Sequence, residues 1–392
     1  MELYTESQEI LEKLGAAITT QEIKQQPDLW QETLNNYQKQ QPRIDEFISS
    51  IIAVENNEKI RVIFTGAGTS AYVGDVLRPY LNRMGNQAEF DFESIPTTDI
   101  VSAPEAFLKQ DCPTILVSFA RSGNSPESVA TVKLAKQLIK TLYQITITCA
   151  KDGHLALEAK DDSNNLLLLM PEKSNDLGFA MTGSFTCMLL SGLLIFDSNS
   201  LDRKKLFVQE IIDMGTEVVA RENEILELLK NDYSRIAYLG SDSLSGLTRE
   251  AQLKVLELTA GELTTIFDSS VGFRHGPKSF INAQTLVFVF VSNQPYTRKY
   301  DLDIAEEIKG DKIAEDIITL DVSGAQNFSG TRFTYNKGMD LPSAYLALPY
   351  VMFAQTIALH SSLKVKNTPD TPSAKGTVNR VVKGVNIYNY DN

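Results

Sequence analysis

The stretch FTGAGTSAYVGD, residues 64–75, follows the apolar run IRVI and predicts how this chain begins its fold. An apolar strand that ends in Gly-x-Gly and enters a helix is typical of a doubly wound α/β unit. Gly66 and Gly68 fit a dinucleotide-binding turn, in which Ala71 would stand in for the third glycine. A tight turn without any ligand is the alternative that this motif leaves open.

A second turn, SFARSGNSPES at residues 118–128, changes this interpretation. It follows the apolar run PTILV and leads into a helix with Pro126 in its first turn. Four serines surround Gly123, namely Ser118, Ser122, Ser125 and Ser128. Free N–H groups at a helix N-terminus, the positive end of its dipole and serine hydroxyls together favour one phosphate. Helix capping explains one of these serines, but not four at one strand end.

Length, charge and cysteine content narrow the class of protein. The chain has 392 residues, 43% of them hydrophobic, which is enough for two domains with their own cores. A formal net charge of -13 without a Lys/Arg block argues against a nucleic-acid partner, but does not forbid a small anionic substrate. Cys112, Cys149 and Cys187 give neither a disulfide framework nor a metal spacing. The polar N-terminus is no signal peptide and no apolar run approaches membrane-spanning length, so we expect a cytoplasmic protein with no membrane partner.

The chain also shows an internal repeat. RIAYLGSDSLSGLTREA in the second half has the layout of RVIFTGAGTSAYVGDVL in the first. Near-continuous apolar strands alternate with helices in both halves, which indicates parallel sheets covered on both faces. The predicted fold is therefore α/β, with two tandem flavodoxin-like units. The predicted boundaries are an N-terminal helical segment over 1–44, interrupted at Pro27 and Pro42, a first unit over 45–200, and a second unit with a C-terminal tail over 201–392.

The two turns together resemble the sugar isomerase (SIS) domain, which binds phosphosugars. The segment EAQLKVLELTAGELTTIFDSSVGFRHGPKSFI resembles the active-site segment of the isomerase half of glucosamine-6-phosphate synthase. DLGFAMTGSFT, which contains Ala180, resembles the substrate-contacting loop of that enzyme. Across residues 45–380 the chain is similar to the tagatose-6-phosphate ketose/aldose isomerase family, whose members act as galactosamine-6-phosphate deaminase/isomerases.

The resemblance has three departures. The chain begins Met1-Glu2-Leu3 and leaves no room for the glutaminase domain of the synthase, so we expect no synthesis of amino sugars from glutamine. Arg121 lies within Ala-Arg-Ser where the synthase has Ser-Gln-Ser, and it either adds charge to the phosphate site or points into solvent. Lys375 falls near the imine-forming lysine of the synthase, but in a different context, and a solvated loop lysine is the alternative.

The resemblance implies two catalytic residues. Moving a carbonyl between C1 and C2 requires ring opening and a proton carried between adjacent carbons, which one desolvated carboxylate can do. The Leu-Lys-x-x-Glu segment selects Glu257, on a helix over 244–260 expected to face the strand ends, rather than Glu250 or Glu262. His275, in the turn Arg-His-Gly-Pro, is the candidate for ring opening, whereas His154 and His360 are expected in a surface turn and in helix packing. The expected phosphate and substrate contacts are Gly68, Thr69, Ser70, Arg121, Ser122, Ser125 and Ala180.

The resemblance implies a phosphosugar aldose/ketose isomerase that converts galactosamine 6-phosphate to tagatose 6-phosphate and ammonia without a cofactor or metal. A homodimer or larger oligomer is expected, with His275 supplied by the neighbouring chain as in the synthase. A plain aldose/ketose phosphate isomerase, a hydrolase of amine adducts of sugar phosphates, a non-catalytic phosphosugar sensor and a dinucleotide-dependent enzyme remain open alternatives.

Overall fold

The computed structural model describes residues 1–55, 58–324, 326–373, 376, 378–380, 382 and 384–390. By internal contacts the chain divides into two compact units that interleave in sequence. The first unit comprises Leu29–Asp176, Gly183–Leu201 and Val378–Asn392, and the second unit comprises Met1–Asp28, Leu177–Thr182 and Asp202–Thr377. The domain boundaries predicted from the sequence repeat, 1–44, 45–200 and 201–392, stay a prediction.

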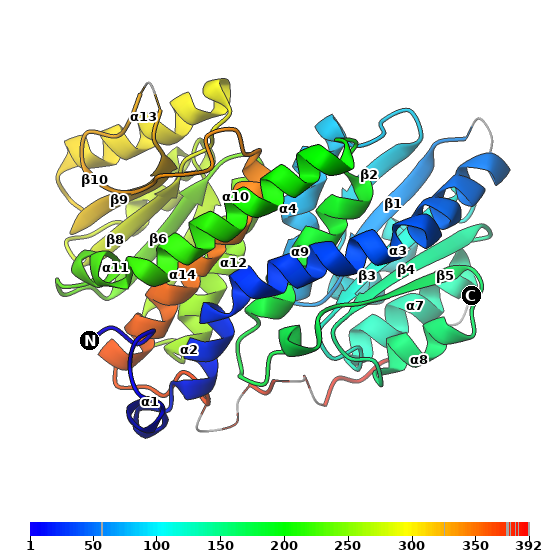
Figure 1. The fold of residues 1–392 in the computed structure, drawn as a ribbon, viewed down its shortest axis with the longest axis horizontal. Coiled ribbons are helices and arrows are strands. Elements are labelled where there is room, and N and C mark those ends of the chain that lie inside the picture. Colours follow the sequence, from blue (N-terminus) through cyan, green and yellow to red (C-terminus); the bar gives the residue numbers. More distant parts are fainter. Residues whose placement is uncertain are drawn as a thin grey trace. The chain divides into compact units, whose positions relative to one another are not determined.

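The first unit contains one parallel sheet and its helices (Figure 1). Its elements in chain order are most of α3 (Gln26–Val54), β1 (Ile60–Thr65), α4 (Thr69–Met84), β2 (Phe90–Ser94), α5 (Thr97–Ser102), α6 (Pro104–Phe107), β3 (Thr114–Ala120), α7 (Pro126–Leu138), β4 (Leu142–Thr148), α8 (His154–Lys160), β5 (Asn165–Leu169), the 3-10 helix η1 (Glu172–Ser174) and α9 (Gly183–Phe196).

The second unit contains the other parallel sheet (Figure 1). Its elements are α1 (Gln8–Leu14), α2 (Ala17–Lys24), α10 (Leu201–Ala220), α11 (Glu222–Leu228), β6 (Arg235–Gly240), α12 (Ser243–Leu258), β7 (Thr264–Ser269), the 3-10 helices η2 (Gly272–Arg274) and η3 (Pro277–Phe280), β8 (Thr285–Phe290), α13 (Pro295–Asp311), β9 (Asp316–Val322), β10 (Thr331–Tyr335) and α14 (Ser343–Lys364).

The two sheets share one topology. The strand orders are β2-β1-β3-β4-β5 in the first sheet and, read from its other edge, β7-β6-β8-β9-β10 in the second. In both sheets the second strand along the chain lies at one edge, beside the first strand, and the third, fourth and fifth strands follow on the other side. All neighbouring strands are parallel. The predicted pair of doubly wound α/β units is therefore confirmed, and in such sheets ligands bind beyond the carboxyl ends of the strands.

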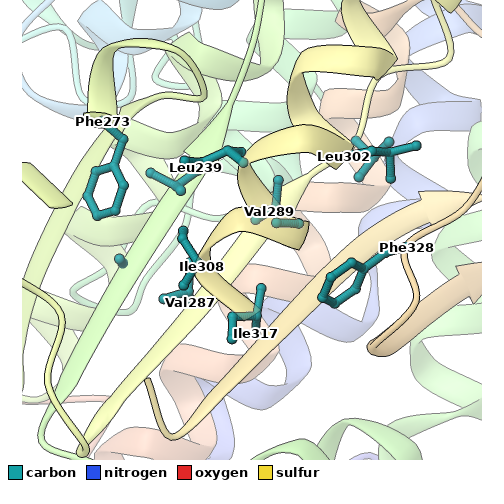
Figure 2. Packing of buried hydrophobic residues seen from close by; sticks show 12 residues of the cluster. Leu239, Phe273, Val287, Val289, Leu302, Ile308, Ile317 and Phe328 are labelled. Carbon is teal, nitrogen blue, oxygen red and sulfur yellow. The ribbon is translucent and has the colours of Figure 1, made fainter. Parts of the chain in front are cut away.

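Both sheets are covered on their two faces by apolar side chains. Every residue of β1, β3 and β8 is buried. In the first unit Phe64 of β1 packs against Phe196 of α9, with ring centroids 5.6 Å apart. In the second unit a cluster between the sheet and α13 joins Val287 and Val289 to Leu302 and Phe273 (Figure 2). This burial explains why the central strands read as continuous apolar runs.

The N-terminal residues are tied to the second unit by a buried carboxylate. Glu222, fully buried at the start of α11, accepts hydrogen bonds from the backbone N–H groups of Leu3 (2.7 Å) and Tyr4 (2.9 Å). His360 of α14 lies 2.7 Å from the same carboxylate through Nε2. Because a buried carboxylate needs such partners, these contacts fix the N-terminus onto the second unit. His360 is thus a packed helix residue, as the sequence predicts, and His154 is exposed at the start of α8.

Two expectations from the sequence are wrong. Pro42 does not interrupt the N-terminal helices but lies inside α3, where it is exposed. An apolar segment of membrane-spanning length does exist, because α14 is 22 residues long and apolar enough. However, 94% of its apolar window is buried inside the structure, as in the core helix of a globular fold.

Candidate active site

The phosphate cup predicted from the two glycine and serine turns lies at one edge of the first sheet. Thr65, the last residue of β1, pairs with Ser118 of β3, and β3 ends two residues later at Ala120, so the two turns begin at the same carboxyl edge of the sheet. Gly66 has no room for a side chain, since a Cβ there would lie 2.6 Å from the backbone of Ser70. Gly68 has φ 55°, a conformation that favours glycine. These two glycines bring the backbone N–H groups of the first turn of α4 to the sheet edge.

Thr97 holds the turn after β1 in place. Its backbone N–H and its hydroxyl both donate to the carbonyl oxygen of Gly66, at 2.8 and 3.1 Å. Thr131 of α7 in turn donates to the carbonyl oxygen of Thr97 at 3.4 Å. Thr69 and Ser70 begin α4 and are buried. The turn is therefore preorganised before any ligand arrives.

The turn after β3 presents its serines differently from ordinary helix caps. Ser125 occupies the N-cap position of α7, but its side chain makes no capping hydrogen bond. The hydroxyl oxygen of Ser122 accepts from the N–H of Asn124 at 3.3 Å. Gly123 has φ 65° and packs near Gly153. A half-buried serine that does not cap its helix is a suitable donor for an anion at that helix N-terminus.

Arg121 is buried, so the interpretation that it points into solvent is wrong. Its Nη2 donates to the backbone carbonyl of Arg380 at 2.6 Å, and the Nε of Arg380 donates to the carbonyl of Asp176 at 2.9 Å. Arg121 therefore holds part of the C-terminal tail against the first unit. A contact between Arg121 and a phosphate stays a prediction.

The segment that carries Ala180 belongs to the second unit. Glu22 of α2 accepts hydrogen bonds from the N–H groups of Leu177 and Gly178, the latter at 3.1 Å. Ala180 is buried, with 2% of its surface exposed. The contact of Ala180 with a substrate is a prediction. Lys375 lies outside the described residues.

Glu257 is held by a buried lysine that the sequence analysis did not single out. Lys254 is 1% exposed, and its Nζ donates to Oε2 of Glu257 at 2.6 Å and lies 3.3 Å from Oε1 of Glu250. Burial alone lowers the pKa of Lys254, but the carboxylates of Glu250 and Glu257 outweigh this and raise it above its usual value. Lys254 is therefore a fixed cation that orients the carboxylate of Glu257. The i, i+3 spacing within LKVLE was the only signal in the sequence for this pair.

His275 is exposed on a rigid turn after β7. Phe273, two residues earlier, is buried in the cluster beneath α13 (Figure 2). Arg274 donates to Glu307 and Asp303 of α13 at 2.6 and 2.7 Å, and Lys278 lies 2.6 Å from Asp311. This combination of a buried anchor and ion pairs to one helix fixes the turn on which His275 is exposed.

The structure does not bring Glu257 and His275 of one chain together. The N–H of Ser270 donates to the carbonyl of Gly240, so the His275 turn begins at the edge where α12 starts. Glu257 is in the last turn of α12, 14 residues after Ser243, and therefore roughly 20 Å along the helix from that edge. Glu257 thus lies near the amino end of β7. The expectation that Glu257 faces the strand ends is therefore wrong for the carboxyl ends of its own sheet.

The described part of the chain contains no group of three or more His, Cys, Asp or Glu side chains that could hold a metal ion. Cys149 and Cys187 are buried, and burial raises the pKa of the Cys149 thiol to about 12. These cysteines therefore fit the prediction of small buried side chains rather than reactive groups.

Comparison with known proteins adds four findings. The model of the SIS domain matches residues 56–197. The D-galactosamine-6-phosphate deaminase AgaS of Shewanella sp. (strain ANA-3) is 40% identical over 383 residues, which cover 97% of this chain and 94% of that protein. The crystal structure of tagatose-6-phosphate ketose/aldose isomerase from Escherichia coli has a TM-score of 0.86 and 38% identity, and covers 95% of this chain and 97% of that one. A more distant relative, the glutamine–fructose-6-phosphate aminotransferase [isomerizing] of Pyrococcus horikoshii, is 21% identical and matches 90% of this chain but 55% of its own length.

Proposed function

This chain belongs to the family of the AgaS galactosamine-6-phosphate deaminases, and on this premise we propose that it converts galactosamine 6-phosphate to tagatose 6-phosphate and ammonia. The family confirms the resemblance to SIS-domain phosphosugar enzymes that the two turns suggested. The substrate remains part of the proposal. The observation that carries the proposal is the ion pair between Glu257 and the buried Lys254. A protein that only bound a phosphosugar would need the phosphate cup but no base, whereas this ion pair holds a carboxylate in a fixed orientation.

The proposed reaction uses this base twice. After ring opening, Glu257 removes the proton from C2 of the open-chain amino aldose and returns it to C1, so that the nitrogen becomes a C2 ketimine. Water then adds to C2 and ammonia leaves, which gives the ketose 6-phosphate. Lys254 keeps the carboxylate oriented throughout, and the hydroxyls of Ser70, Ser122 and Ser125 bind the phosphate with the N-termini of α4 and α7.

We also propose that His275 acts in the active site of a second chain. Ring opening needs an acid–base group near C1 and the ring oxygen, and imidazole is suited to this task. Glu257 and His275 of one chain lie at opposite ends of the second unit, so the partner's His275 would have to complete the site. A homodimer is thus part of this proposal, as is the cytoplasmic location expected from the sequence.

A plain aldose/ketose isomerase is the second candidate, because the structural relative is named for that reaction. Ammonia release distinguishes the two. We expect the purified protein to release ammonia from galactosamine 6-phosphate, and from glucosamine 6-phosphate at a different rate. Isomerisation of tagatose 6-phosphate without any ammonia from either amino sugar would favour the second candidate.

The catalytic base is tested by Glu257→Gln, which keeps the shape and removes the base. We expect kcat to fall by about 10²–10⁴ and the exchange of the C2 proton with solvent deuterium to fall with it. Glu262→Gln is the matched control. If exchange persists at the normal rate in Glu257→Gln, another group carries the proton.

A further inference from the structure

The C-terminal tail returns to the first unit and is anchored there at two places. Residues Val378–Asn392 belong to the first unit by their contacts, although they follow the second unit in sequence. One anchor is Arg380. The other is Tyr390, which packs against an apolar cluster of the first unit and accepts from Nε2 of Gln137 at 3.2 Å through its backbone carbonyl (Figure 1). Gln137 is in the last turn of α7, roughly 18 Å along that helix from Ser125, so only the Arg380 anchor lies beside the serine turn.

The guanidinium of Arg380 joins the tail to the turn after β5. Its Nε donates to the backbone carbonyl of Asp176 at 2.9 Å, and its Nη2 donates to Oδ1 of Asn175 at 3.2 Å. Asp176 is fully buried and is itself fixed, since its carboxylate accepts from the N–H groups of Gly183 and Ser184 at 3.0 and 2.9 Å. Arg380 is therefore attached to a rigid part of the first unit.

The backbone of Arg380 holds the turn after β3. Its carbonyl oxygen accepts from Nη2 of the buried Arg121 at 2.6 Å, and Arg121 directly precedes Ser122. The N–H of Cys149 donates to the carbonyl of Ala120 at 3.2 Å, so the turns after β3 and β4 lie side by side under this part of the tail. A buried guanidinium is costly without its hydrogen-bond partners. The position of Arg121, and of the serine turn that follows it, therefore depends on Arg380 staying in place.

Arg380 also brings a positive charge to this edge of the sheet. Among the described residues, its guanidinium bonds to a backbone carbonyl and to an amide oxygen, and to no carboxylate. Burial raises the pKa of Cys149 to about 12, and the nearby charges of Arg121 and Arg380 oppose this rise. Two guanidinium groups close to one strand end attract an anion, and this attraction weakens as salt is added.

We propose that Arg380 is a positioning residue of the phosphate site, which locks the tail between the turns after β3 and β5 and so holds Arg121 and the serine turn in place for the anion. This inference rests on the proposed function, because the cup is the place where the sugar phosphate would bind. Arg380 follows Arg121 by 259 residues, so the site is complete only when the end of the chain has folded back onto the first unit.

The first test measures the affinity for inorganic phosphate by calorimetry and the kinetics with galactosamine 6-phosphate. Arg380→Ala should weaken phosphate binding and raise KM by roughly ten- to a hundredfold, the effect of losing one charged hydrogen bond. Its kcat should stay within about threefold of the wild type, because Glu257 and Lys254 are unchanged. Arg380→Lys keeps the charge and one donor and should recover part of the lost affinity. Tyr390→Ala is the matched control, since it weakens the other tail anchor, and it should keep the KM and phosphate affinity of the wild type.

Salt dependence distinguishes this role from a purely structural one. Phosphate binding by the wild type should weaken more steeply with added sodium chloride than binding by Arg380→Gln, which keeps a donor but loses the charge. Equal salt dependence, or equal weakening of binding in Arg380→Ala and Tyr390→Ala, would overturn the inference. So would a folded Arg380→Ala variant that is less stable to urea but binds phosphate as tightly as the wild type. If Arg380→Ala does not fold, wild-type affinity in both Arg380→Lys and Arg380→Gln would overturn the inference, and a loss that is larger in Arg380→Gln would support it.

Failure of this inference and failure of the proposed function give different results. If phosphate binding depends on Arg380 but neither amino sugar releases ammonia, the positioning role stands and the deaminase function is wrong. If ammonia is released with the same KM by the wild type and by Arg380→Ala, the function stands and the positioning role is wrong.

Discussion

The turn between β1 and α4 and the turn between β6 and α12 have nearly the same backbone. Gly68 has φ 55° and ψ -129°, and Asp242 at the same place in the second unit has φ 57° and ψ -133°. Gly66 and Gly240 are both too close to the following helix to carry a side chain. One folding solution is therefore used twice, and the side chains around it decide what each copy does.

In the second unit a side chain of the unit itself occupies the space beyond the carboxyl ends of the strands. Asp301, the sixth residue after the first proline of α13, accepts from the hydroxyls of Ser241 (2.5 Å) and Ser270 (2.6 Å) and from the N–H of Ser292 (3.0 Å). These donors follow β6, β7 and β8. Val132 has the corresponding position in α7 of the first unit and is apolar. The second unit thus supplies its own anion where the first unit is proposed to bind a phosphate.

The helix N-termini differ in the same sense. The side chain of Gln294 caps α13 by accepting from the N–H of Thr297 at 2.7 Å, whereas Ser125 does not cap α7. A repeated fold can therefore fill the strand ends of one copy with its own side chains, while those of the other copy carry the proposed ligand site. In the second unit the hydrogen bond from Ser270 to Asp301 also anchors the turn that carries His275, because Ser270 directly precedes that turn.

The largest effect is expected when a carboxylate is placed in the turn between β1 and α4, because the matching turn between β6 and α12 already has one in Asp242. Gly68→Asp is sterically possible, because a Cβ there meets nothing within 4 Å, although the left-handed backbone costs about 1–2 kcal/mol. A negative charge beside the phosphate should raise KM by at least about 100-fold. Gly68→Asn carries the same backbone cost without the charge and should have a smaller effect. Equal KM values for the two variants would show that no anion binds there.

The internal anion of the second unit should make stability depend on pH. Burial raises the pKa of Asp301 to about 6, although the hydroxyls of Ser241 and Ser270 oppose this. The unfolded chain has the usual value of 3.8, so the folded protein binds the extra proton between these pH values. Ionisation should therefore lower the free energy of unfolding as pH rises from about 4 to about 6, by roughly 3 kcal/mol in all.

Asp301→Asn cannot ionise and isolates this contribution. We expect its stability relative to the wild type to increase over the same pH range and to stay constant above it, measured by urea unfolding. Parallel stability curves for the two proteins would contradict the assignment.

Single hydroxyl deletions compare the two strand ends directly. Ser122→Ala should raise KM by roughly ten- to a hundredfold, because one charge-assisted hydrogen bond contributes about 1.5–3 kcal/mol. Ser292→Ala removes a hydroxyl at the corresponding end of the second sheet and should leave KM unchanged. An equal change in both variants would mean that the two ends do not differ in ligand binding.

The smallest expected effects concern the two helix caps. Gln294→Ala should lower the free energy of unfolding by about 1 kcal/mol, because it removes a used cap, and should not change KM. Ser125→Ala should do the reverse, with unchanged stability and a higher KM. Thermal unfolding and initial-rate measurements on both variants test this, and a stability loss in Ser125→Ala would show that its hydroxyl is structural.

The sequence predicted the central strands and both turns because these elements are specified locally. Continuous apolar runs gave β1, β3 and β8, and Gly-Ser punctuation gave the turns. The strands β2, β7 and β10 were missed, since FDFES, TTIFDS and TRFTY mix polar and apolar residues as edge strands do. The prediction that Pro42 interrupts a helix failed because the 29-residue helix α3 continues through an exposed Pro42 and tolerates the one hydrogen bond that a proline cannot make.

The site was predictable only in part. The glycines and serines of the cup could be found because they follow adjacent strands, and Glu257 and His275 could be found through resemblance. The role of Lys254 depends on its burial between two carboxylates, which the letters LKVLE do not reveal. Asp301 could not be predicted at all, because it is 60 residues from Ser241 and joins three strand ends only once the sheet has formed.

The attachment of the N-terminus to α11 and α14 has a consequence for synthesis on the ribosome. Tyr4 bonds to Thr356 across 352 residues, and Thr19 bonds to Asp370 across 351 residues. At about 5–20 residues per second, α1 and α2 emerge roughly 20–70 s before the helix that they pack against has been made. Their apolar side chains have no core to join during this interval. We therefore expect nascent chains to be most vulnerable to proteases and aggregation at their first 28 residues, and chaperones that bind this end to increase the yield of folded protein.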